Sequence, residues 1–176
     1  MDGNKEIFEK AGILNDHGRN KKDPEHKLFW MRDYGYKYKM SNIQAALGCA
    51  QIKRIEDLVT KKRKVFSWYV SLFKNTERIK MNLQQEYVIN SYWMPTILID
   101  NFTLTERDDL ILFLKDNNID ARPFFYPLSS LPMFKKNQRN HISYKIGSKG
   151  INLPSFHDIT FNEVLNVTKT IIKYLN

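Results

Sequence analysis

Apolar residues recur at helical spacing over the longest stretch of the chain, from about residue 41 to residue 74. The helical spacing holds up to Ala50 and resumes at Ile55, with a slip between them. Ser41 and Gln44 form a capping-box pattern, in which the hydroxyl accepts an orphan backbone N–H and the amide side chain reaches back. The pattern therefore predicts two helices, or one bent helix, that begin at Ser41.

Three further helices are predicted. The first is a short helix at Lys5–Leu14. The second begins at a cap formed by Thr105–Asp108 and carries one apolar stripe, which consists of Leu110, Ile111, Phe113 and Leu114. The last begins at the capping box Thr160–Glu163 and continues with apolar residues at helical spacing to Leu175.

Two stretches read as strands. Ser91–Asp100 is rich in apolar and aromatic residues, and its Pro95 predicts a bulge or an edge position. Ile119–Tyr126 has the same character and ends at Pro127. With the helix between them, these strands form a unit of the length that a crossover connection needs. We therefore predict an α/β fold: one compact domain preceded by an extended N-terminal segment.

Composition narrows the class of protein without naming a function. The chain has 176 residues, a net charge of +9 and 42% hydrophobic residues, which is enough to build a core. No apolar run approaches the ~20 residues of a membrane-spanning helix, and no signal peptide is expected. The lone Cys49 excludes an internal disulfide and indicates a reducing, cytoplasmic location. No glycine-rich phosphate loop is present.

A metal site or an activated nucleophile is not indicated. The four histidines share no ligand spacing; they are His17, His26, His141 and His157. Cys49 lies between Gly48 and Ala50 on an apolar helix face, so we interpret it as a small core residue rather than a nucleophile.

A basic run, Lys61–Lys64, follows Lys53 and Arg54 in the long helical stretch. It is typical of a phosphate-binding or localisation segment, or of a solvated helix face. Since Ile55, Leu58 and the following apolar residues already occupy the buried stripe, we favour the solvated face. Nucleic acid is therefore not an expected partner.

Two segments carry unusual side chains. In Asp33–Asn42, tyrosines and lysines precede a capped helix N-terminus, which is suited to a phosphate or carboxylate. The alternative is a solvated loop packed by its aromatic rings.

In Ala121–Pro127, prolines flank Arg122, two phenylalanines and Tyr126, and a rigid segment of this kind can present a guanidinium and a phenol to a ligand. The alternative there is a proline-terminated strand with core phenylalanines.

Taken together, five motifs resemble those of the DegT/DnrJ/EryC1/StrS group of pyridoxal-phosphate-dependent sugar aminotransferases, and most closely its perosamine-synthase branch. In chain order they are Asn15–Arg19, Gly35–Gly48, Ser91–Met94, Arg122–Leu128 and Gly150–Ser155. The resemblance implies the C-terminal small domain of a fold-type I transferase, with a long helix leading into a strand–helix–strand domain. We accordingly expect a junction segment at 1–40, a connecting helix or helix pair at 41–75 and a small α/β domain at 76–176.

The resemblance also implies that this chain matches only the C-terminal half of family members. The lysine that forms the Schiff base with pyridoxal 5'-phosphate, and the acidic partner of the pyridinium nitrogen, belong to the other half. We therefore expect no catalytic residue in this chain and no activity from it alone. It would be a cropped piece of a longer protein, one product of a split gene or a decayed remnant.

Site residues follow from the same resemblance. Lys37 and Lys39 stand where the family usually has Asn and Arg, and the first of these positions reaches the cofactor phosphate across the dimer. Arg122, Tyr126 and Ser129 are expected at the substrate, although many relatives have a histidine in place of Ser129. His17 and Arg19 are assigned a structural role.

The implied function is transfer of an amino group from glutamate to a 4-keto-6-deoxy nucleotide sugar, for a surface polysaccharide. The implied partners are a second copy in a homodimer or a complementing N-terminal half. The alternative is a non-catalytic remnant or a binding module for an anionic ligand or partner subunit.

Overall fold

The computed structural model describes residues 4–20, 22, 24, 34–82, 84–131, 135 and 138–176. His26 and Asp33, which the sequence analysis named, lie outside the described residues. The chain divides into two compact units, residues 1–54 and 55–176, and each is described by itself.

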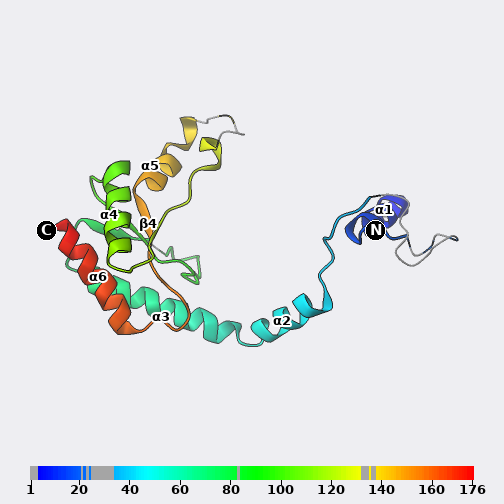
Figure 1. Ribbon diagram of the computed structural model, residues 1–176, viewed down its shortest axis with the longest axis horizontal. Coiled ribbons are helices and arrows are strands. Elements are labelled where there is room, and N and C mark those ends of the chain that lie inside the picture. Colours follow the sequence, from blue (N-terminus) through cyan, green and yellow to red (C-terminus); the bar gives the residue numbers. More distant parts are fainter. Residues whose placement is uncertain are drawn as a thin grey trace. The chain divides into compact units, whose positions relative to one another are not determined.

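The first unit contains helices α1 (Lys5–Asn15) and α2 (Asn42–Ile52) (Figure 1). Both begin where a polar side chain accepts backbone N–H groups. Asn4 caps α1, and the capping box predicted for Ser41 and Gln44 is confirmed, with Gln44 N–H donating to Ser41 Oγ at 3.3 Å. The slip in apolar spacing also corresponds to a break, because α2 ends at Ile52 and the next helix begins at Ile55.

The second unit is built on a four-stranded sheet of described residues in the order β1-β2-β4-β3, with every neighbouring pair antiparallel. Its strands are β1 (Ile79–Met81), β2 (Thr96–Ile99), β3 (Arg122–Pro123) and β4 (Gly150–Asn152). Its helices are α3 (Ile55–Phe73), α4 (Leu104–Asp116), α5 (His141–Lys149) and α6 (Phe161–Leu175), and short 3₁₀ turns occupy Leu128–Ser130 and Gln138–Asn140.

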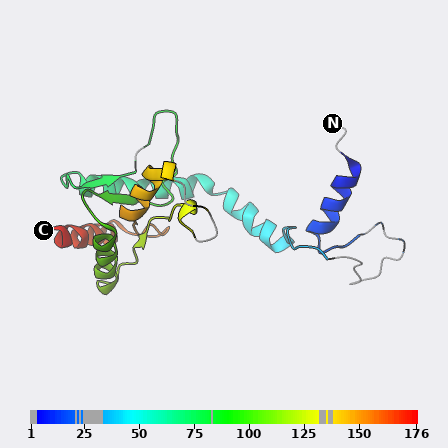
Figure 2. The same ribbon diagram turned by 90° about the horizontal axis from the view of Figure 1, so that it is seen from above.

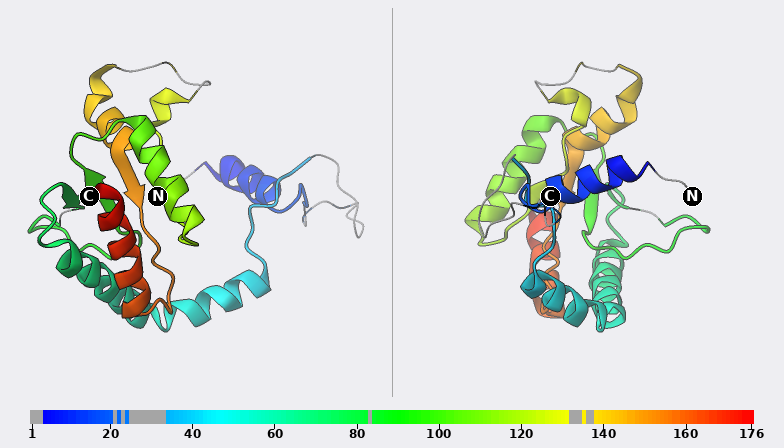
Figure 3. Two further views of the ribbon diagram at one scale, coloured as in Figure 1. Left: turned by 60° about the vertical axis from the view of Figure 1, so that its left-hand side comes forward. Right: turned by 90° about the vertical axis from the view of Figure 1, so that its right-hand side faces the viewer.

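Since β2 and β3 both run antiparallel to β4, they are parallel to each other, and α4 connects them (Figures 1 and 3). The predicted strand–helix–strand unit therefore exists, but β4, from a later part of the chain, lies between its two strands. The α/β class is confirmed. Residues 84–95, which precede β2, extend away from the sheet (Figure 2).

Helices α3, α4 and α6 enclose one hydrophobic core with the sheet. Alternate residues of the strands face this core, since Ile97, Ile99 and Ile151 are fully buried there. The helices contribute their apolar stripes, which include Tyr69, Phe73, Leu110, Leu114, Val164, Val167 and Ile171. Burial of this apolar surface is the main force that holds the unit together.

Hydrogen bonds of buried polar side chains link three strands on the sheet face opposite the hydrophobic core. Thr96 Oγ1 donates to Asn152 Oδ1 at 2.9 Å, and Asn152 Nδ2 donates to the carbonyl of Pro123 at 3.2 Å. These bonds join β2, β4 and β3 in one register, because a slipped strand would leave a buried polar group without a partner.

Three local predictions were wrong. The cap of α4 is Thr103, with Glu106 as its partner, and not Thr105. Pro95 occupies neither an edge nor a bulge: it directly precedes β2, which is an inner strand. Both predicted strands are also much shorter than expected, because the flanking aromatic residues lie in loops. At α6, by contrast, the predicted capping box of Thr160 and Glu163 is confirmed.

Candidate functional site

In the first unit, the segment that carries Lys37 lies beside the end of α1. Asp16 and Lys37 form an isolated antiparallel bridge. His17 N–H donates to the carbonyl of Tyr36 at 3.1 Å, and Tyr38 N–H donates to that of Asn15 at 3.2 Å. Two resemblance motifs that are separated along the chain, Asn15–Arg19 and the tyrosine-lysine segment, are therefore one structural feature.

Charge in this feature is distributed unevenly between the two lysines. Lys39 Nζ lies 3.5 Å from a carboxylate oxygen of Asp16, and Arg19 lies 3.9 Å from the other oxygen. Lys37 is exposed and forms no ion pair with any residue that the structure describes. Of the two lysines in this feature, Lys37 is thus the one better able to bind an anion from outside the chain.

Glycine at position 35 permits the close contact between the two segments. A Cβ atom on Gly35 would overlap the backbone nitrogen of Gly18 and lie 2.5 Å from the carbonyl carbon of His17. Gly18 and His17 have positive φ values of 76° and 62°, so this turn has little freedom to move aside.

We expect Gly35→Ala to open the bridge between Asp16 and Lys37. The amides of His17 and Tyr38 should then exchange with solvent at least about tenfold faster, as measured by hydrogen exchange. Gly12→Ala is the matched control, because a Cβ there meets no atom within 4 Å. Protected amides in Gly35→Ala would show that the bridge does not depend on this glycine.

The tyrosines of this segment are exposed rather than buried, at 75% for Tyr34, 49% for Tyr36 and 75% for Tyr38. The rings of Tyr36 and Tyr38 stack on each other with centroids 5.2 Å apart. At the adjacent α2 N-terminus, Ser41 already accepts the Gln44 amide. The Gln44 amide is therefore not open to an anion.

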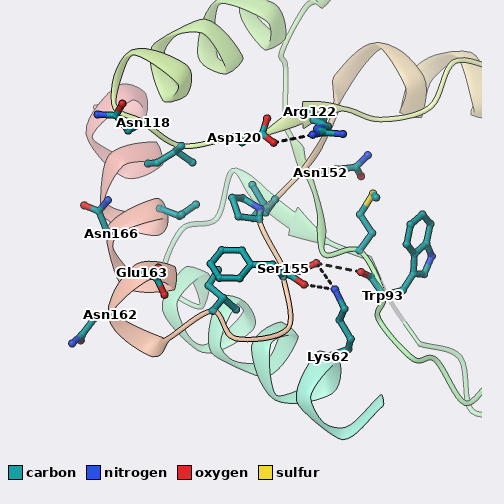
Figure 4. A pocket seen from close by; sticks show the side chains of 17 residues that line it. Lys62, Trp93, Asn118, Asp120, Arg122, Asn152, Ser155, Asn162, Glu163 and Asn166 are labelled. Atoms are coloured by element: carbon teal, nitrogen blue, oxygen red, sulfur yellow. Dashed lines mark hydrogen bonds and ion pairs between the residues drawn. The ribbon is translucent and has the colours of Figure 1, made fainter. Parts of the chain in front are cut away.

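In the second unit, Arg122 lines a cavity of about 760 Å³ (Figure 4). Its guanidinium donates to Asp120 at 2.9 Å, which raises the pKa of Arg122 and keeps it charged. The cavity lies between the start of α6, the loop before β3 and the loop after β4. Side chains labelled around it include Lys62, Trp93, Asn152 and Ser155.

The predicted solvated face of the basic run in α3 holds for Lys61 and Lys64, which are exposed, but Lys62 and Arg63 are half-buried against loops. Lys62 Nζ donates to the carbonyl and to the hydroxyl of Ser155, and burial lowers the pKa of Lys62. Arg63 Nε donates to the carbonyl of Asn90 at 2.8 Å. Lys61 lies 2.9 Å from a ring nitrogen of His157. These contacts attach α3 to the loops after β1 and β4.

Tyr126 and Ser129 occupy a different place from Arg122 and are not among the residues that line its cavity. Ser129 Oγ lies 3.1 Å from the hydroxyl of Tyr144. Asn140 Nδ2 donates to Ser129 Oγ at 3.2 Å. The Tyr126 ring lies 6.0 Å from the guanidinium carbon of Arg107. The structure therefore places Tyr126 near α4 and Ser129 near α5.

Arg107 is the important residue that the sequence reasoning missed. It is fully buried, donates to the carbonyl of Gly147 at 2.7 Å, and donates twice to Asp108 Oδ1 at 2.9 and 2.6 Å. A signal for this burial was present, because Arg107 continues the stripe of Leu110 and Leu114 at helical spacing.

A second cavity, of about 680 Å³, opens on the sheet face opposite the core. Thr96 and Leu98 of β2 line it, together with aromatic side chains of Tyr92, Trp93, Phe124 and Phe125. Trp93 lines both cavities, and the sequence analysis did not single it out for a role.

Cys49 is exposed, so its assignment to the core was wrong; none of the residues of α2 is buried. The part of the chain that the structure describes holds no group of three or more His, Cys, Asp or Glu residues placed for a metal ion. None of its helices is both long and apolar enough to cross a membrane.

The DegT/DnrJ/EryC1/StrS aminotransferase family matches the chain over residues 2–172. GDP-perosamine synthase of Escherichia coli O157:H7 is 33% identical over 150 residues, which cover 85% of this chain and 40% of that protein. GDP-perosamine synthase of Vibrio cholerae is 31% identical over 153 residues, which cover 85% of this chain and 41% of that protein. A putative sugar aminotransferase of Streptococcus pneumoniae, solved in its PLP form, has a TM-score of 0.79 at 23% identity and covers 99% of this chain and 44% of its own.

The chain thus spans about two fifths of the length of the curated relatives that it matches. The structural likeness confirms the predicted fold, that of the small domain of a fold-type I pyridoxal-phosphate-dependent transferase. Pyridoxal phosphate is the cofactor of this family. With a family match that extends over nearly all of its length, the chain belongs to the DegT/DnrJ/EryC1/StrS aminotransferase family.

Proposed function

We propose that this chain is the C-terminal part of a nucleotide-sugar aminotransferase of the perosamine-synthase kind. The reaction would transfer the amino group of glutamate to a GDP-linked 4-keto-6-deoxy sugar in surface polysaccharide biosynthesis. The observation that carries this proposal is the 33% identity to a GDP-perosamine synthase over 85% of the chain. A cytoplasmic location belongs to the same proposal.

The residues of this chain are suited to binding rather than to bond breaking. Lys37 has an exposed ammonium without an ion pair among the described residues, which fits a cofactor phosphate from a partner subunit. Lys39 is shared with Asp16 and would add charge. Bound pyridoxal phosphate supplies an electron sink, and the chain's own groups would hold and orient its phosphate.

In the second unit, Arg122, Tyr126 and Ser129 are the proposed substrate-binding residues. Arg122 lines the large cavity with one nitrogen already bonded to Asp120. Tyr126 and Ser129 lie outside that cavity, so they would contact a different portion of the substrate. The corresponding division of the chain is a junction segment at 1–40, a connecting helix pair at 41–75 and a small domain at 76–176.

The test is complementation. The DNA directly upstream of Met1 is read for an N-terminal half that contains the Schiff-base lysine, and that polypeptide is co-expressed with this chain. We expect glutamate-dependent amination of the GDP-4-keto-6-deoxy sugar from the pair and none from the chain alone. Catalytic turnover by this chain alone would contradict the proposal that the N-terminal half supplies the catalytic residues. A pair that binds the cofactor but aminates no nucleotide sugar would contradict the proposed reaction.

One observation favours a second function, that of a module that binds a partner subunit. No residue of α2 is buried, and Ile43, Leu47 and Ile52 are exposed at 75%, 61% and 71%. Such an apolar helix surface is typical of an interface. Association through α2, whether in a homodimer or with a complementing half, should be nearly independent of salt, whereas binding of an anion by the +9 chain should weaken as salt rises. Sedimentation of the chain at low and at high salt distinguishes association through α2 from binding of an anion.

A further inference from the structure

Trp93 is unusually exposed for its size and lies where the two cavities meet. Its side chain is 58% exposed, and it lines both the cavity of Arg122 and the aromatic cavity on the sheet. The indole stacks on Phe125, itself 57% exposed, with ring centroids 6.2 Å apart and planes 22° apart. More than half of each side chain in this stacked pair is therefore exposed to solvent.

The backbone at Trp93 is held from both sides. Ser155 Oγ donates to the carbonyl of Trp93 at 3.2 Å, and Lys62 Nζ fixes that hydroxyl from 3.1 Å (Figure 4). On the preceding side, Asn90 Oδ1 accepts the N–H of Tyr92 at 2.8 Å. The backbone at Trp93 is therefore positioned by α3, by the loop after β4 and by Asn90.

The residue before Trp93 is strained. Tyr92 has φ of 50°, a left-handed conformation that an aromatic residue adopts only when its surroundings require it. Its ring stacks on Phe66 of α3, with centroids 3.6 Å apart. Strain of this kind is concentrated at ligand-binding sites, where it orients a neighbouring side chain before the ligand arrives.

Cationic groups flank this aromatic surface. Arg122 and Lys62 line the same cavity as Trp93, and in the view of Figure 4 Arg122 lies above the level of Trp93 and Lys62 below it. Lys62 donates its hydrogen bond to Ser155. Arg122 forms an ion pair with Asp120 through one nitrogen, and 74% of its side chain is exposed to solvent. A flat ring beside an exposed guanidinium is suited to a ligand that joins a planar base to a phosphate group.

We propose that Trp93 stacks on the nucleobase of a nucleoside diphosphate, that Phe125 supports the indole ring, and that Arg122 binds the diphosphate. This proposal rests on the proposed function, since it names the part of the nucleotide sugar that this chain recognises. Base stacking tolerates different bases, so the site would select for the diphosphate more strongly than for the base.

The test measures binding to the full chain without any amino transfer. GDP is titrated by equilibrium dialysis, with inorganic pyrophosphate and mannose 1-phosphate as separate probes. We expect GDP to bind more tightly than either probe, because only GDP has both a base that can stack on Trp93 and a diphosphate that can bind Arg122. Equal binding of mannose 1-phosphate would overturn the assignment of a nucleobase, and absence of GDP binding at millimolar concentration would overturn the whole site.

Paired variants locate the binding. Trp93→Ala should weaken GDP binding about tenfold, whereas Trp93→Phe should retain most of it. Tyr87→Ala, at a side chain that is 85% exposed and lines neither cavity, is the control. Arg122→Gln should also weaken GDP binding about tenfold and reduce its salt dependence, with Lys115→Gln as the control. Wild-type affinity in Trp93→Ala would exclude the proposed stack.

Failure of this site and failure of the proposed function are distinguishable. If complemented Trp93→Ala enzyme aminates the nucleotide sugar with an unchanged KM, the site is wrong and the function stands. If GDP binds through Trp93 but the complemented pair aminates no nucleotide sugar, the site stands and the reaction is wrong.

Discussion

Replacing Arg107 by alanine should lower the free energy of unfolding of the second unit by about 3 kcal/mol. Arg107 is buried: its side chain is 1% exposed and connects α4 to the Gly147 carbonyl in α5 at 2.7 Å. Truncation removes a large buried side chain and leaves that carbonyl without its donor. Urea denaturation followed by circular dichroism measures the loss.

Two further variants separate the causes. Arg107→Met keeps most of the buried volume but donates no hydrogen bond, so it should recover part of the lost stability if packing matters. Lys115→Ala, an exposed change on the same helix, should stay within about 0.5 kcal/mol of the parent chain. An Arg107→Ala chain as stable as this control would show that the buried guanidinium contributes nothing.

Tyr69 is the second residue with a large expected effect. It is fully buried in the core, and its hydroxyl donates to the carbonyl of Pro154 at 2.9 Å. We expect Tyr69→Ala to cost about 3–5 kcal/mol, because it leaves an aromatic-sized cavity beneath the sheet. Tyr69→Phe should cost only about 1 kcal/mol, the contribution of one hydrogen bond. Urea denaturation at neutral pH compares the two.

The same tyrosine predicts a pH dependence. Burial raises the pKa of Tyr69, so the folded chain keeps the phenolic proton at a pH at which the unfolded chain has released it. Its contribution to stability is therefore intact below about pH 10 and is lost as the pH rises further. The stability difference between the parent chain and Tyr69→Phe should shrink or reverse between about pH 8 and about pH 11. A constant difference across that range would contradict the assigned shift.

Several features could be predicted from the sequence because they depend on neighbours within a turn of helix. The capping boxes at Ser41 and Thr160 each join residues three apart, and both are present as predicted. The break between Ala50 and Ile55 was visible in the apolar spacing. The five motifs were enough to identify the family, since their order and residue types were all in the chain. The roles of Lys37, Lys39, Arg122, Tyr126 and Ser129 remain predictions.

Other features were decided only by tertiary structure. The cap of α4 was misplaced by two residues, because Thr103 and Thr105 both offer a hydroxyl near an acidic residue. The strands are two to four residues long, too short for a period-two pattern, and β4 enters the sheet from a distant part of the chain. Exposure of Cys49 was equally hidden, since an apolar helix face is apolar whether or not a partner covers it.

The chain's sequence by itself therefore predicted α1, α2, α3, α4 and α6, the α/β class and the family, all of which follow from short-range pattern, whereas α5 was not predicted. Tertiary structure decided that Arg107 is buried, that Tyr126 and Ser129 lie apart from the cavity of Arg122, and that Lys62 and Ser155 hold Trp93 in place. Each of these joins residues far apart in the chain. Which distant groups meet is set by packing of the whole unit, and hydrophobic burial is non-directional, so local residue order does not encode it.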